Sequence, residues 1–425
     1  MIKKMIPKKI KNFYHFLWAW FGFFIYRNPA KDIFVIGVTG TSGKSSSVYF
    51  LRLILENLGF KVGALSTIEF YIDGVQKDND QKMTMLGKTQ IQKYLKEMVK
   101  KKCDFAIIEV SSEGVVQNRH KFINFDTILL TNLYPEHLEA HGGFENYKNA
   151  KIKFFKDVAN SKRKILNGKK INKIAIVNSD FKYFEEFLNF NFENKIEFSS
   201  KNVETKIIKN GMEFVYENKK YQANIFGEYN VANLLGIIKI LENLKIDKEK
   251  IIEAISKIKS VPGRIEFISE AEKYGFAVIV DYAFEPVALS ELYKVVDLFI
   301  KNRLIQVFGG TGGGRDRARR PKIGFLAGKK ADICILTDED PYDEDPEKII
   351  ADVEKGVVDS GKILDQNYFK ILDRKKAIAF AIKKAEKGDL ILITGKGSEK
   401  MICVKNGKMI PHDDREVVRE LLKQK

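Results

Sequence analysis

An apolar run leads directly into a loop of glycines, hydroxyls and one lysine in the stretch VIGVTGTSGKSS, residues 35–46. Beyond the loop, apolar residues recur at helical spacing, at Val48, Leu51, Ile54, Leu55 and Leu58. Gly59 then stands where a helix commonly ends. A turn from strand to helix presents backbone N–H groups and the positive end of the helix to an anion. The stretch therefore predicts a phosphate-binding loop.

The loop carries the residue types that phosphate and magnesium require. Lys44 supplies a positive charge and Ser45 a hydroxyl that can ligate Mg²⁺, in the order of a P-loop. The sequence departs from the P-loop motif at one position. Val38 stands where the motif usually has its first glycine, and Gly37 precedes it. We predict that the loop binds ATP through Gly40, Thr41, Gly43, Lys44, Ser45 and Ser46.

The chain contains eight apolar runs, separated by stretches in which apolar residues recur at helical spacing. The loop follows the first run. The runs span residues 33–38, 105–110, 127–131, 174–178, 278–282, 304–309, 333–337 and 390–394. This alternation is typical of parallel sheets covered by helices, and 425 residues suffice for two or three domains. We predict an α/β protein with a mostly parallel P-loop-type sheet and a Rossmann-like domain. Its expected parts are a basic, aromatic segment (1–31), a central ATP-binding domain (32–262) and the C-terminal Rossmann-like domain (263–425).

Two metal-binding residue types follow strands near the loop. Glu109 is the last residue but one of the run 105–110, and His137 comes shortly after the run 127–131. Because the carboxyl ends of parallel strands meet at one edge of a sheet, we expect both side chains near Lys44. A carboxylate suits Mg²⁺, whereas a histidine is a less usual ligand that its neighbours must orient. The sequence predicts a magnesium site at this edge.

The first 31 residues combine lysines with aromatic side chains. Five lysines precede an aromatic run over 13–26, which is shorter than the roughly 20 apolar residues of a membrane-spanning helix. No small-residue cleavage site follows, which argues against a secretory signal. Two interpretations stay open. The segment is either a helix packed on the body of the protein or a basic helix of residues 1–30 that lies in the membrane interface.

Charge and cysteine content restrict the partners and the compartment. The net charge of +17 favours anionic partners, although scattered lysines also form an ordinary solvated surface. Cys103, Cys334 and Cys403 lie far apart, with neither metal-ligand spacing nor a disulfide pattern. We therefore expect a reducing cytoplasm, with the inner face of the membrane as a second location if the N-terminal helix is interfacial.

An ordered series of motifs resembles the Mur ligase family, and within it the peptidoglycan tripeptide synthetases. The motifs run from about residue 33 to the C-terminus: GVTGTSGKSS, EVSS, TNLYPEHLEAHG, NYKNAK, GEYNVAN, VPGRIE, VDYAFEPVAL, FGGTGGGRDRARRP, TDEDPYDEDP, GKGSE and DDREVV. Each motif is weak alone, but the series is specific. The UDP-binding domain that usually stands first in the family has no counterpart in residues 1–31.

The resemblance implies an ATP-dependent ligase that forms an amide bond through an acyl phosphate. It implies that Lys44 and Ser45 hold the phosphates and one Mg²⁺, while Glu109 and His137 hold metal. Lys151 occupies the place of a lysine that family members carbamylate, and a carbamate could bind a second Mg²⁺. Further implied ATP contacts are Asn230, Asn233, Arg264 and Asp281. The implied acceptor contacts are Thr84, Ser111, Ser112 and Arg119, and those of the incoming amino acid are Asp340, Tyr342, Gly395 and Glu399.

The sequence departs from the family at the residues that select the amino acid. Members that use meso-diaminopimelate usually carry Asp-Asn-Pro-Arg, whose arginine grips the distal carboxylate, but residues 339–342 read Glu-Asp-Pro-Tyr. An acidic pair beside a tyrosine suits a side-chain cation. Lysine or ornithine is therefore expected rather than diaminopimelate, although Asp343, Glu344 and Asp345 also fit a solvated acidic loop.

Three alternatives stay open. Another Mur-like amide ligase, of the folylpolyglutamate synthase type or acting on a lipid-linked cell-wall precursor, would share the fold and the ATP chemistry. A nucleic-acid-binding P-loop NTPase is favoured by the charge and by GGGRDRARRPK, although no aromatic stacking pattern surrounds that cluster. The altered loops would suit an inactive scaffold. We expect a monomer that binds a muramoyl-peptide acceptor and a free amino acid, and no nucleic acid.

Overall fold

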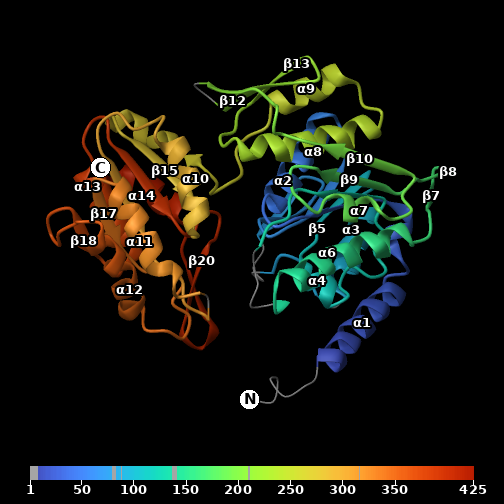
Figure 1. Cartoon of the computed structure of the whole chain (residues 1–425), viewed down its shortest axis with the longest axis horizontal. Helices are drawn as coiled ribbons and strands as arrows, with labels where there is room; N and C mark the ends of the chain where they lie inside the picture. Colours follow the sequence, from blue (N-terminus) through green and yellow to red (C-terminus); the bar gives the residue numbers. More distant parts are fainter. Residues whose placement is uncertain (1–7, 79–82, 88, 136–140, 209–210, 315) are drawn as a thin grey trace. The chain divides into compact units, whose positions relative to one another are not determined.

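A computed structural model of the chain describes residues 8–78, 83–87, 89–135, 141–208, 211–314 and 316–425. The chain divides into two compact units, Met1–Lys259 and Ser260–Lys425, and each is built around a sheet of its own (Figure 1). This arrangement confirms the predicted α/β class with mostly parallel sheets. The domain limits expected at 31/32 and 262/263 stay predictions.

The first unit contains an eight-stranded sheet in the order β10-β9-β6-β1-β5-β2-β3-β4. Its strands are β1 (Phe34–Thr39), β2 (Val62–Leu65), β3 (Glu69–Ile72), β4 (Val75–Asp78), β5 (Phe105–Glu109), β6 (Thr127–Leu130), β9 (Ile174–Asn178) and β10 (Asn194–Phe198). The six strands from β10 to β2 run parallel, and β3 and β4 add an antiparallel edge. β1 therefore lies between β5 and β6, and the loop after it faces the ends of both neighbours.

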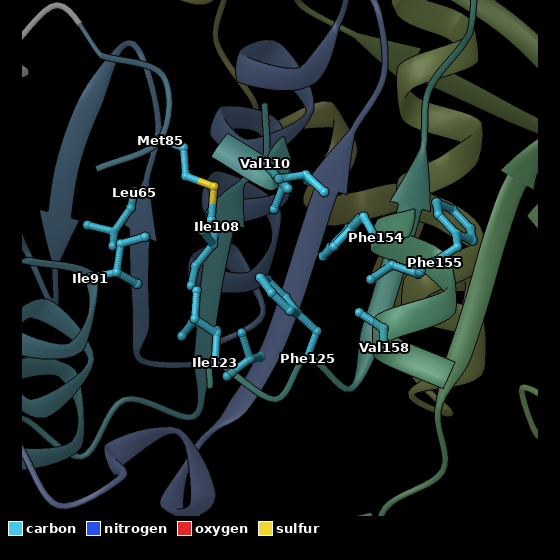
Figure 2. Close-up of a cluster of buried hydrophobic side chains, with 14 of the residues drawn as sticks. Leu65, Met85, Ile91, Ile108, Val110, Ile123, Phe125, Phe154, Phe155 and Val158 are labelled. Atoms are coloured by element: carbon cyan, nitrogen blue, oxygen red, sulfur yellow. The ribbon is translucent and has the colours of Figure 1, made fainter. Parts of the chain in front are cut away.

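Helices cover both faces of this sheet. The helical elements are α1 (Lys8–Ile25), η2 (Pro29–Asp32), α2 (Lys44–Asn57), α3 (Gln90–Lys100), α4 (Ser112–Val116), α6 (Phe144–Ala159), α7 (Glu185–Leu188), α8 (Tyr229–Asn243) and α9 (Lys248–Ser256). On one face, strand residues such as Ile108 pack with Phe154 of α6 (Figure 2). Leu129 faces the other way, toward Gly236 of α8. No helix among those described is long and apolar enough to span a membrane.

The core explains one glycine of β1. A Cβ at Gly37 would lie 2.8 Å from the ring of Phe125, which packs edge-on against Phe154 at 5.1 Å between ring centroids (Figure 2). Contacts under 3 Å are not sustained between carbon atoms, so a larger residue would displace the ring. The glycine before Val38 thus has a packing role in the strand.

The first unit also holds two small antiparallel sheets that the sequence analysis did not predict. They are formed by β7 (Ile165–Leu166) with β8 (Lys169–Lys170), and by β11 (Thr205–Ile208), β12 (Gly211–Tyr216) and β13 (Lys219–Ala223). Exposed lysines and other polar residues interrupt the apolar residues in these strands. Such strands lack the continuous apolar runs of a parallel sheet.

The second unit is built on a six-stranded sheet in the order β14-β15-β19-β16-β17-β18. Its strands are β14 (Glu266–Phe267), β15 (Ala277–Asp281), β16 (Leu304–Phe308), β17 (Ile333–Leu336), β18 (Tyr368–Lys370) and β19 (Leu390–Thr394). Around them lie η3 (Ser269–Tyr274), α10 (Pro286–Val296), α11 (Arg319–Lys330), α12 (Pro346–Asp359), α13 (Arg374–Lys384), α14 (Asp414–Gln424) and the hairpin β20 (Met401–Val404), η4 (Lys405–Gly407), β21 (Lys408–Pro411). All pairs in the large sheet are parallel except β14 with β15.

A buried ion pair joins two helices of the second unit. Nη2 of Arg374 at the start of α13 donates to Oδ2 of Asp414 at the start of α14, at 2.7 Å, and its Nε donates to Oδ1 at 2.8 Å. Both side chains are almost fully buried. Burial alone would raise the pKa of Asp414, but the charge of Arg374 and hydrogen bonds from Arg374 and His412 hold it well below its usual value.

Candidate active site

The loop between β1 and α2 requires glycine at two positions. Gly40 and Gly43 both have a positive φ, 155° and 77°, and Gly43 forms the N-terminal cap of α2. A Cβ at Gly40 would overlap the hydroxyl of Thr131, and one at Gly43 would overlap the side-chain oxygen of Asn233. Conformation and space therefore both exclude larger residues, and the backbone of the loop stays open to a ligand.

Asn132 holds the loop in shape from the end of β6. Its Oδ1 accepts hydrogen bonds from the backbone N–H groups of Thr41, at 3.1 Å, and Ser42, at 2.9 Å. Lys44 begins α2, and its Nζ donates to the carbonyl of Thr41 at 2.7 Å. The sequence analysis did not single out Asn132; its place directly after a buried strand was the available signal.

Glu109 and Ser45 are in direct contact. Oε1 of Glu109 accepts a hydrogen bond from Oγ of Ser45 at 2.9 Å, and Oε2 accepts from the backbone N–H of Thr67 at 2.8 Å and from its Oγ1 at 3.1 Å. The carboxylate is 1% exposed. The strand order thus brings together two of the predicted metal-binding side chains. Thr67, which follows β2 and orients the carboxylate, was not predicted.

Lys151 of α6 lies beneath the loop. Its Nζ donates to the carbonyl of Gly40 at 2.7 Å and lies 4.7 Å from the centre of the Tyr147 ring. The hydroxyl of Tyr147 donates to Oγ1 of Thr41 at 3.1 Å. Lys151 is therefore buried beside the loop, where the sequence placed it, and Tyr147 is a further neighbour that sequence reasoning missed.

His137, the fourth predicted metal-binding residue, lies outside the described residues. Among the residues that are described, no three His, Cys, Asp or Glu side chains are grouped as they would be to hold a metal ion. The protein groups that the structure brings together here are the Ser45 hydroxyl and the Glu109 carboxylate, both oxygen donors of the kind that Mg²⁺ prefers.

Three of the predicted acceptor residues, Ser111, Ser112 and Arg119, follow β5, and Thr84 precedes α3. Ser111 caps α4 by accepting from the backbone N–H of Gly114 at 3.1 Å, and Oγ of Ser112 lies 3.0 Å from Nε2 of His141. Arg119 donates to the carbonyl of Met85, the residue after Thr84. Burial lowers the pKa of Arg119. Thr84 and Arg119 thus lie close together, and His141 is a neighbour that the sequence did not reveal.

Two asparagines of α8 support the loop from behind. Nδ2 of Asn233 donates to Oδ1 of Asn230 at 3.0 Å, and Nδ2 of Asn230 donates to the carbonyl of Phe226 at 2.7 Å. Both side chains are buried, and Asn233 lies against Gly43. The predicted ATP contacts Asn230 and Asn233 therefore lie beside the predicted phosphate-binding loop.

In the second unit, Arg264 and Asp281 form a local cluster with Tyr282. Asp281 ends β15 and accepts from the backbone N–H groups of Ile265 and Ala283, each at 2.7 Å. Burial raises the pKa of Asp281. The Arg264 guanidinium lies 4.3 Å from the centre of the Tyr282 ring, and among the described residues its buried Nε has no hydrogen-bond partner.

Asp340, one of the two acidic residues predicted to select the amino acid, is already paired with a cation from the protein itself. Nζ of Lys396, which is wholly buried, donates to Oδ2 of Asp340 at 2.9 Å, to Oε2 of Glu399 at 2.7 Å and to the carbonyl of Met401 at 2.6 Å. Oδ1 of Asp340 accepts from the backbone N–H of Cys403 at 2.6 Å. The sequence analysis missed Lys396, although it lies inside the GKGSE motif.

Glu339, Tyr342 and Gly395 complete this region. Glu339 accepts from Oγ1 of Thr311 at 2.7 Å, and burial raises the pKa of this carboxyl group. Gly395 has a positive φ, and a Cβ there would overlap the Glu339 carboxylate. The backbone N–H of Tyr342 donates to the carbonyl of Cys403 at 2.9 Å, which ties its loop to the hairpin. The Glu339 carboxyl group therefore has a hydrogen-bond partner within its own unit.

The rest of the acidic run is structural. The Asp343 carboxylate accepts from the backbone N–H of Asn406 at 2.8 Å, and Asp345 caps α12. Glu344 pairs with Arg320 at 3.0 Å. Arg319 and Arg320 are buried and pair with carboxylates of their own unit, so two arginines of the cluster GGGRDRARRPK do not form a surface for nucleic acid.

The comparisons with known proteins agree with this geometry. The sequence matches the profile of the Mur ligase middle domain over residues 38–241 and that of the Mur ligase glutamate ligase domain over 263–397. A UDP-N-acetylmuramoyl-L-alanyl-D-glutamate--2,6-diaminopimelate ligase of Clostridium botulinum is 37% identical, covering 94% of this chain and 80% of the relative. A UDP-N-acetylmuramyl-tripeptide synthetase of Borrelia garinii is 35% identical, covering 93% and 78%.

Solved structures give the same result. A UDP-N-acetylmuramoyl-L-alanyl-D-glutamate--2,6-diaminopimelate ligase superposes with a TM-score of 0.62 at 28% identity, covering 92% of this chain and 79% of that structure. A Mycobacterium tuberculosis folylpolyglutamate synthase, solved with ADP and AMPPCP, has a TM-score of 0.69 at 15% identity and covers 96% and 95%. At 15% identity the second likeness concerns the fold alone.

Proposed function

The chain belongs to the Mur ligase family, and from this premise we propose that it adds a diamino acid, L-lysine in the first place, to a muramoyl-dipeptide. As a member of the family it is an ATP-dependent ligase that forms carbon–nitrogen bonds in peptidoglycan synthesis. The observation that carries the proposal is the contact of Ser45 with Glu109 beside a loop that also holds Lys44 and Lys151.

The loop has the properties that a triphosphate and Mg²⁺ require. Glycine at positions 40 and 43 leaves the backbone accessible, Lys44 is cationic, and α2 begins at the loop. Ser45 and Glu109 would hold one Mg²⁺ through oxygen atoms, and bound Mg²⁺ supplies positive charge that offsets the charge of the phosphates. The Arg264 guanidinium in the second unit, with its buried Nε, is a further ATP contact, together with Asp281.

The reaction that we propose has two steps. An oxygen of the acceptor carboxylate attacks the γ-phosphorus, a P–O bond forms, and ADP leaves with the electrons of the broken bond. Lys44 offsets the repulsion between the two anions. The amine of the incoming amino acid then attacks the acyl carbon and loses a proton, and phosphate leaves as the amide forms. An acyl phosphate hydrolyses in water, so we propose that water is excluded from the acyl phosphate during turnover.

Lys151 has a position that suits the proposed carbamate. The lysine Nζ donates to the carbonyl of Gly40 at 2.7 Å, and a carbamate nitrogen keeps one N–H that can make the same bond. Carbamylation would replace the buried lysine cation with an anion beside the loop. The two carbamate oxygens could then help to hold a second Mg²⁺ together with His137. Carbamylation thus requires no movement of the lysine nitrogen.

Thr84, Ser111, Ser112 and Arg119 are the proposed contacts of the acceptor. A chain of contacts connects Ser112 with the loop. Ser112 contacts His141, and the His141 ring packs edge-on against the Tyr147 ring, at 5.2 Å between ring centroids. The Tyr147 hydroxyl donates a hydrogen bond to Thr41 of the loop. Arg119 is the cation of the group and would meet an acidic part of the acceptor. The acceptor would thereby lie along the same edge of the sheet as the γ-phosphate.

The charges around Lys396 favour lysine or ornithine over diaminopimelate. Asp340 and Glu399 contribute two negative charges and Lys396 one positive charge, which leaves one negative charge for the amino acid to offset. Lysine has a net charge of plus one, whereas diaminopimelate is neutral overall. Glu399 is the more exposed carboxylate, at 25% against 7% for Asp340, and is therefore the proposed direct contact, with Tyr342 and Gly395 beside it.

The folylpolyglutamate synthase alternative rests on the shared fold alone, at 15% identity, whereas the relatives above 30% identity are named for muramoyl-peptide substrates. The test incubates the purified chain with ATP, Mg²⁺, UDP-muramoyl-dipeptide and mixed amino acids, and resolves the product by mass. The proposal predicts a product heavier by one lysine residue, with one ADP per product. A diaminopimelate product would overturn the lysine assignment, and ATP turnover that ignores the acceptor would overturn the ligase.

A further inference from the structure

Helix α1 holds a face of large apolar side chains outward. Figure 1 shows α1, in blue, on the outside of the first unit. The exposed side chains recur at helical spacing on this face, and they are Phe13, Leu17, Trp20, Phe21 and Phe24, with exposed fractions of 61, 43, 44, 49 and 57%. Soluble surfaces seldom gather so many aromatic side chains in one place, so the face has the composition of a binding surface.

The opposite face of α1 is packed, which fixes the outward orientation. Ala19 and Gly22 are buried, and a Cβ at Gly22 would lie 3.0 Å from the backbone of Thr89. The rings of Phe16 and Phe23 lie 5.5 and 5.3 Å from that of Phe122. The helix therefore packs on the body of the protein, as one interpretation of the sequence held, and still presents a second apolar face.

Positive charge flanks the exposed face at its C-terminal end. A pocket of about 370 Å³ there is lined by Ile25, Tyr26, one glutamate and four basic residues, Arg27, Lys93, Lys96 and Lys100. The sequence before the face also has five lysines within its first eleven residues. Aromatic side chains beside a basic cluster match the apolar boundary and the phosphates of an anionic bilayer.

We propose that this face, together with the basic pocket beside Ile25, binds the surface of an anionic lipid bilayer, with α1 lying in the interface. Charge complementarity selects this occupant over a second copy of the chain. Two copies meeting here would bring the basic residues beside Ile25 into one interface, and each copy carries a net charge of +17. An interfacial helix also needs no membrane-spanning length.

Docking through α1 would place the acceptor residues near the bilayer. His15 interacts electrostatically with Arg119 and Glu113, and Phe122, against which α1 packs, follows Arg119 by three residues. An acceptor held at the membrane would therefore reach this side of the site. This consequence rests on the proposed function, whereas lipid binding by α1 does not.

The chain offers a specific probe, because its two tryptophans, Trp18 and Trp20, both lie on α1. In the full chain with Trp18→Phe, the emission of Trp20 reports on the exposed face alone. Vesicles of phosphatidylglycerol with phosphatidylcholine should shift this emission to shorter wavelength, and lipids brominated in the acyl chain should quench it. High salt should weaken the binding, and phosphatidylcholine alone should bind at least tenfold more weakly.

Matched variants separate the contributions of apolar and basic side chains to vesicle binding. Leu17→Ala with Phe24→Ala should weaken vesicle binding at least tenfold, while Val287→Ala with Ile363→Ala, two exposed apolar residues of the second unit, should leave it unchanged. Lys93→Glu with Lys100→Glu should weaken binding to anionic vesicles by about fivefold for each charge removed, or more. Each variant should keep its circular dichroism spectrum and its ADP release with a soluble acceptor.

Two results would overturn the proposal. In one, anionic vesicles leave the Trp20 emission unchanged and the protein stays in the supernatant after sedimentation. In the other, sedimentation velocity without lipid shows a dimer that Leu17→Ala with Phe24→Ala dissociates, which would assign the face to a second copy. Neither result bears on the ligase activity, so failure here is distinguishable from failure of the proposed function.

Discussion

Replacing Lys396 with methionine tests the cluster that organises the proposed amino-acid site. The ammonium is wholly buried and donates three hydrogen bonds, two of them to carboxylates, at 2.9 Å to Asp340 and 2.7 Å to Glu399. Methionine has a similar length and no charge, so the change leaves both carboxylates without this cation. Loss of the partner costs more free energy at Asp340, because its side chain is only 7% exposed and water cannot fully replace the lost ammonium.

The expected loss follows from these contacts. Breaking a buried ion pair by removing one partner costs about 3–5 kcal/mol. Glu399 is 25% exposed, so water can replace its lost partner, and Asp340 keeps its hydrogen bond from the backbone N–H of Cys403. We therefore expect a loss at the lower end of this range, about 3 kcal/mol of unfolding free energy. Adding Asp340→Asn to Lys396→Met should recover about 1–2 kcal/mol, because the buried charge is then gone as well.

Hydrogen exchange in urea, resolved by mass spectrometry, reads the stability of the unit Ser260–Lys425 separately from that of the first unit. Lys423→Met, an exposed lysine of α14, is the matched control and should change stability by less than about 0.5 kcal/mol. The KM for lysine should rise at least tenfold in Lys396→Met while the KM for ATP stays unchanged. A loss below about 1 kcal/mol together with an unchanged KM for lysine would show that Lys396 does not organise this site.

Three further predictions concern other parts of the two units. Glu109→Gln keeps the size of the side chain but removes its charge, so ligase activity should fall at least 100-fold at saturating Mg²⁺ with the fold intact by circular dichroism; activity near that of the unchanged chain would contradict the metal role. Gly43→Ala should abolish ATP binding in calorimetry, because the added Cβ overlaps Asn233 at a positive φ, and wild-type affinity would contradict this. The lowered pKa of Asp414 stabilises the second unit above the unfolded value of about 3.9, and this stability is lost as the pH falls below it. The stability lost in Asp414→Asn, measured by urea unfolding, should therefore be constant from about pH 5 to 8 and shrink below about pH 4, and a constant difference at low pH would contradict the assignment.

Eight of the fourteen described strands in the two large sheets were predictable because they form continuous apolar runs. Each of the eight runs is a strand that begins and ends within one residue of the predicted limits, since strands covered by helices on both faces have no polar alternation. The small sheet of β11, β12 and β13 was missed for the opposite reason. Its residues alternate between buried and exposed, and the pairing is set by neighbours that the local sequence does not identify.

At the site, sequence reasoning identified residues but not their partners. Glu109 was placed near Ser45 because strand ends share an edge, and the contact at 2.9 Å agrees with that expectation. Thr67 and Asn132 were missed, since a polar residue after a strand gains a role only when the strand order is known. Lys396 was missed for a related reason. Its pairing with Asp340 joins residues 56 positions apart, which no local pattern encodes.

In the proposed reaction the acceptor carboxylate is activated by phosphoryl transfer at the loop of Lys44 and then joined to an amine. Labelling that carboxylate with oxygen-18 tests this order of steps, with the full chain, ATP, Mg²⁺ and lysine, and with mass analysis of the phosphate released. We expect one oxygen-18 atom in the inorganic phosphate for each amide formed, because the carboxylate oxygen leaves with the phosphoryl group. Amide formation with unlabelled phosphate, or with the label in AMP, would contradict it.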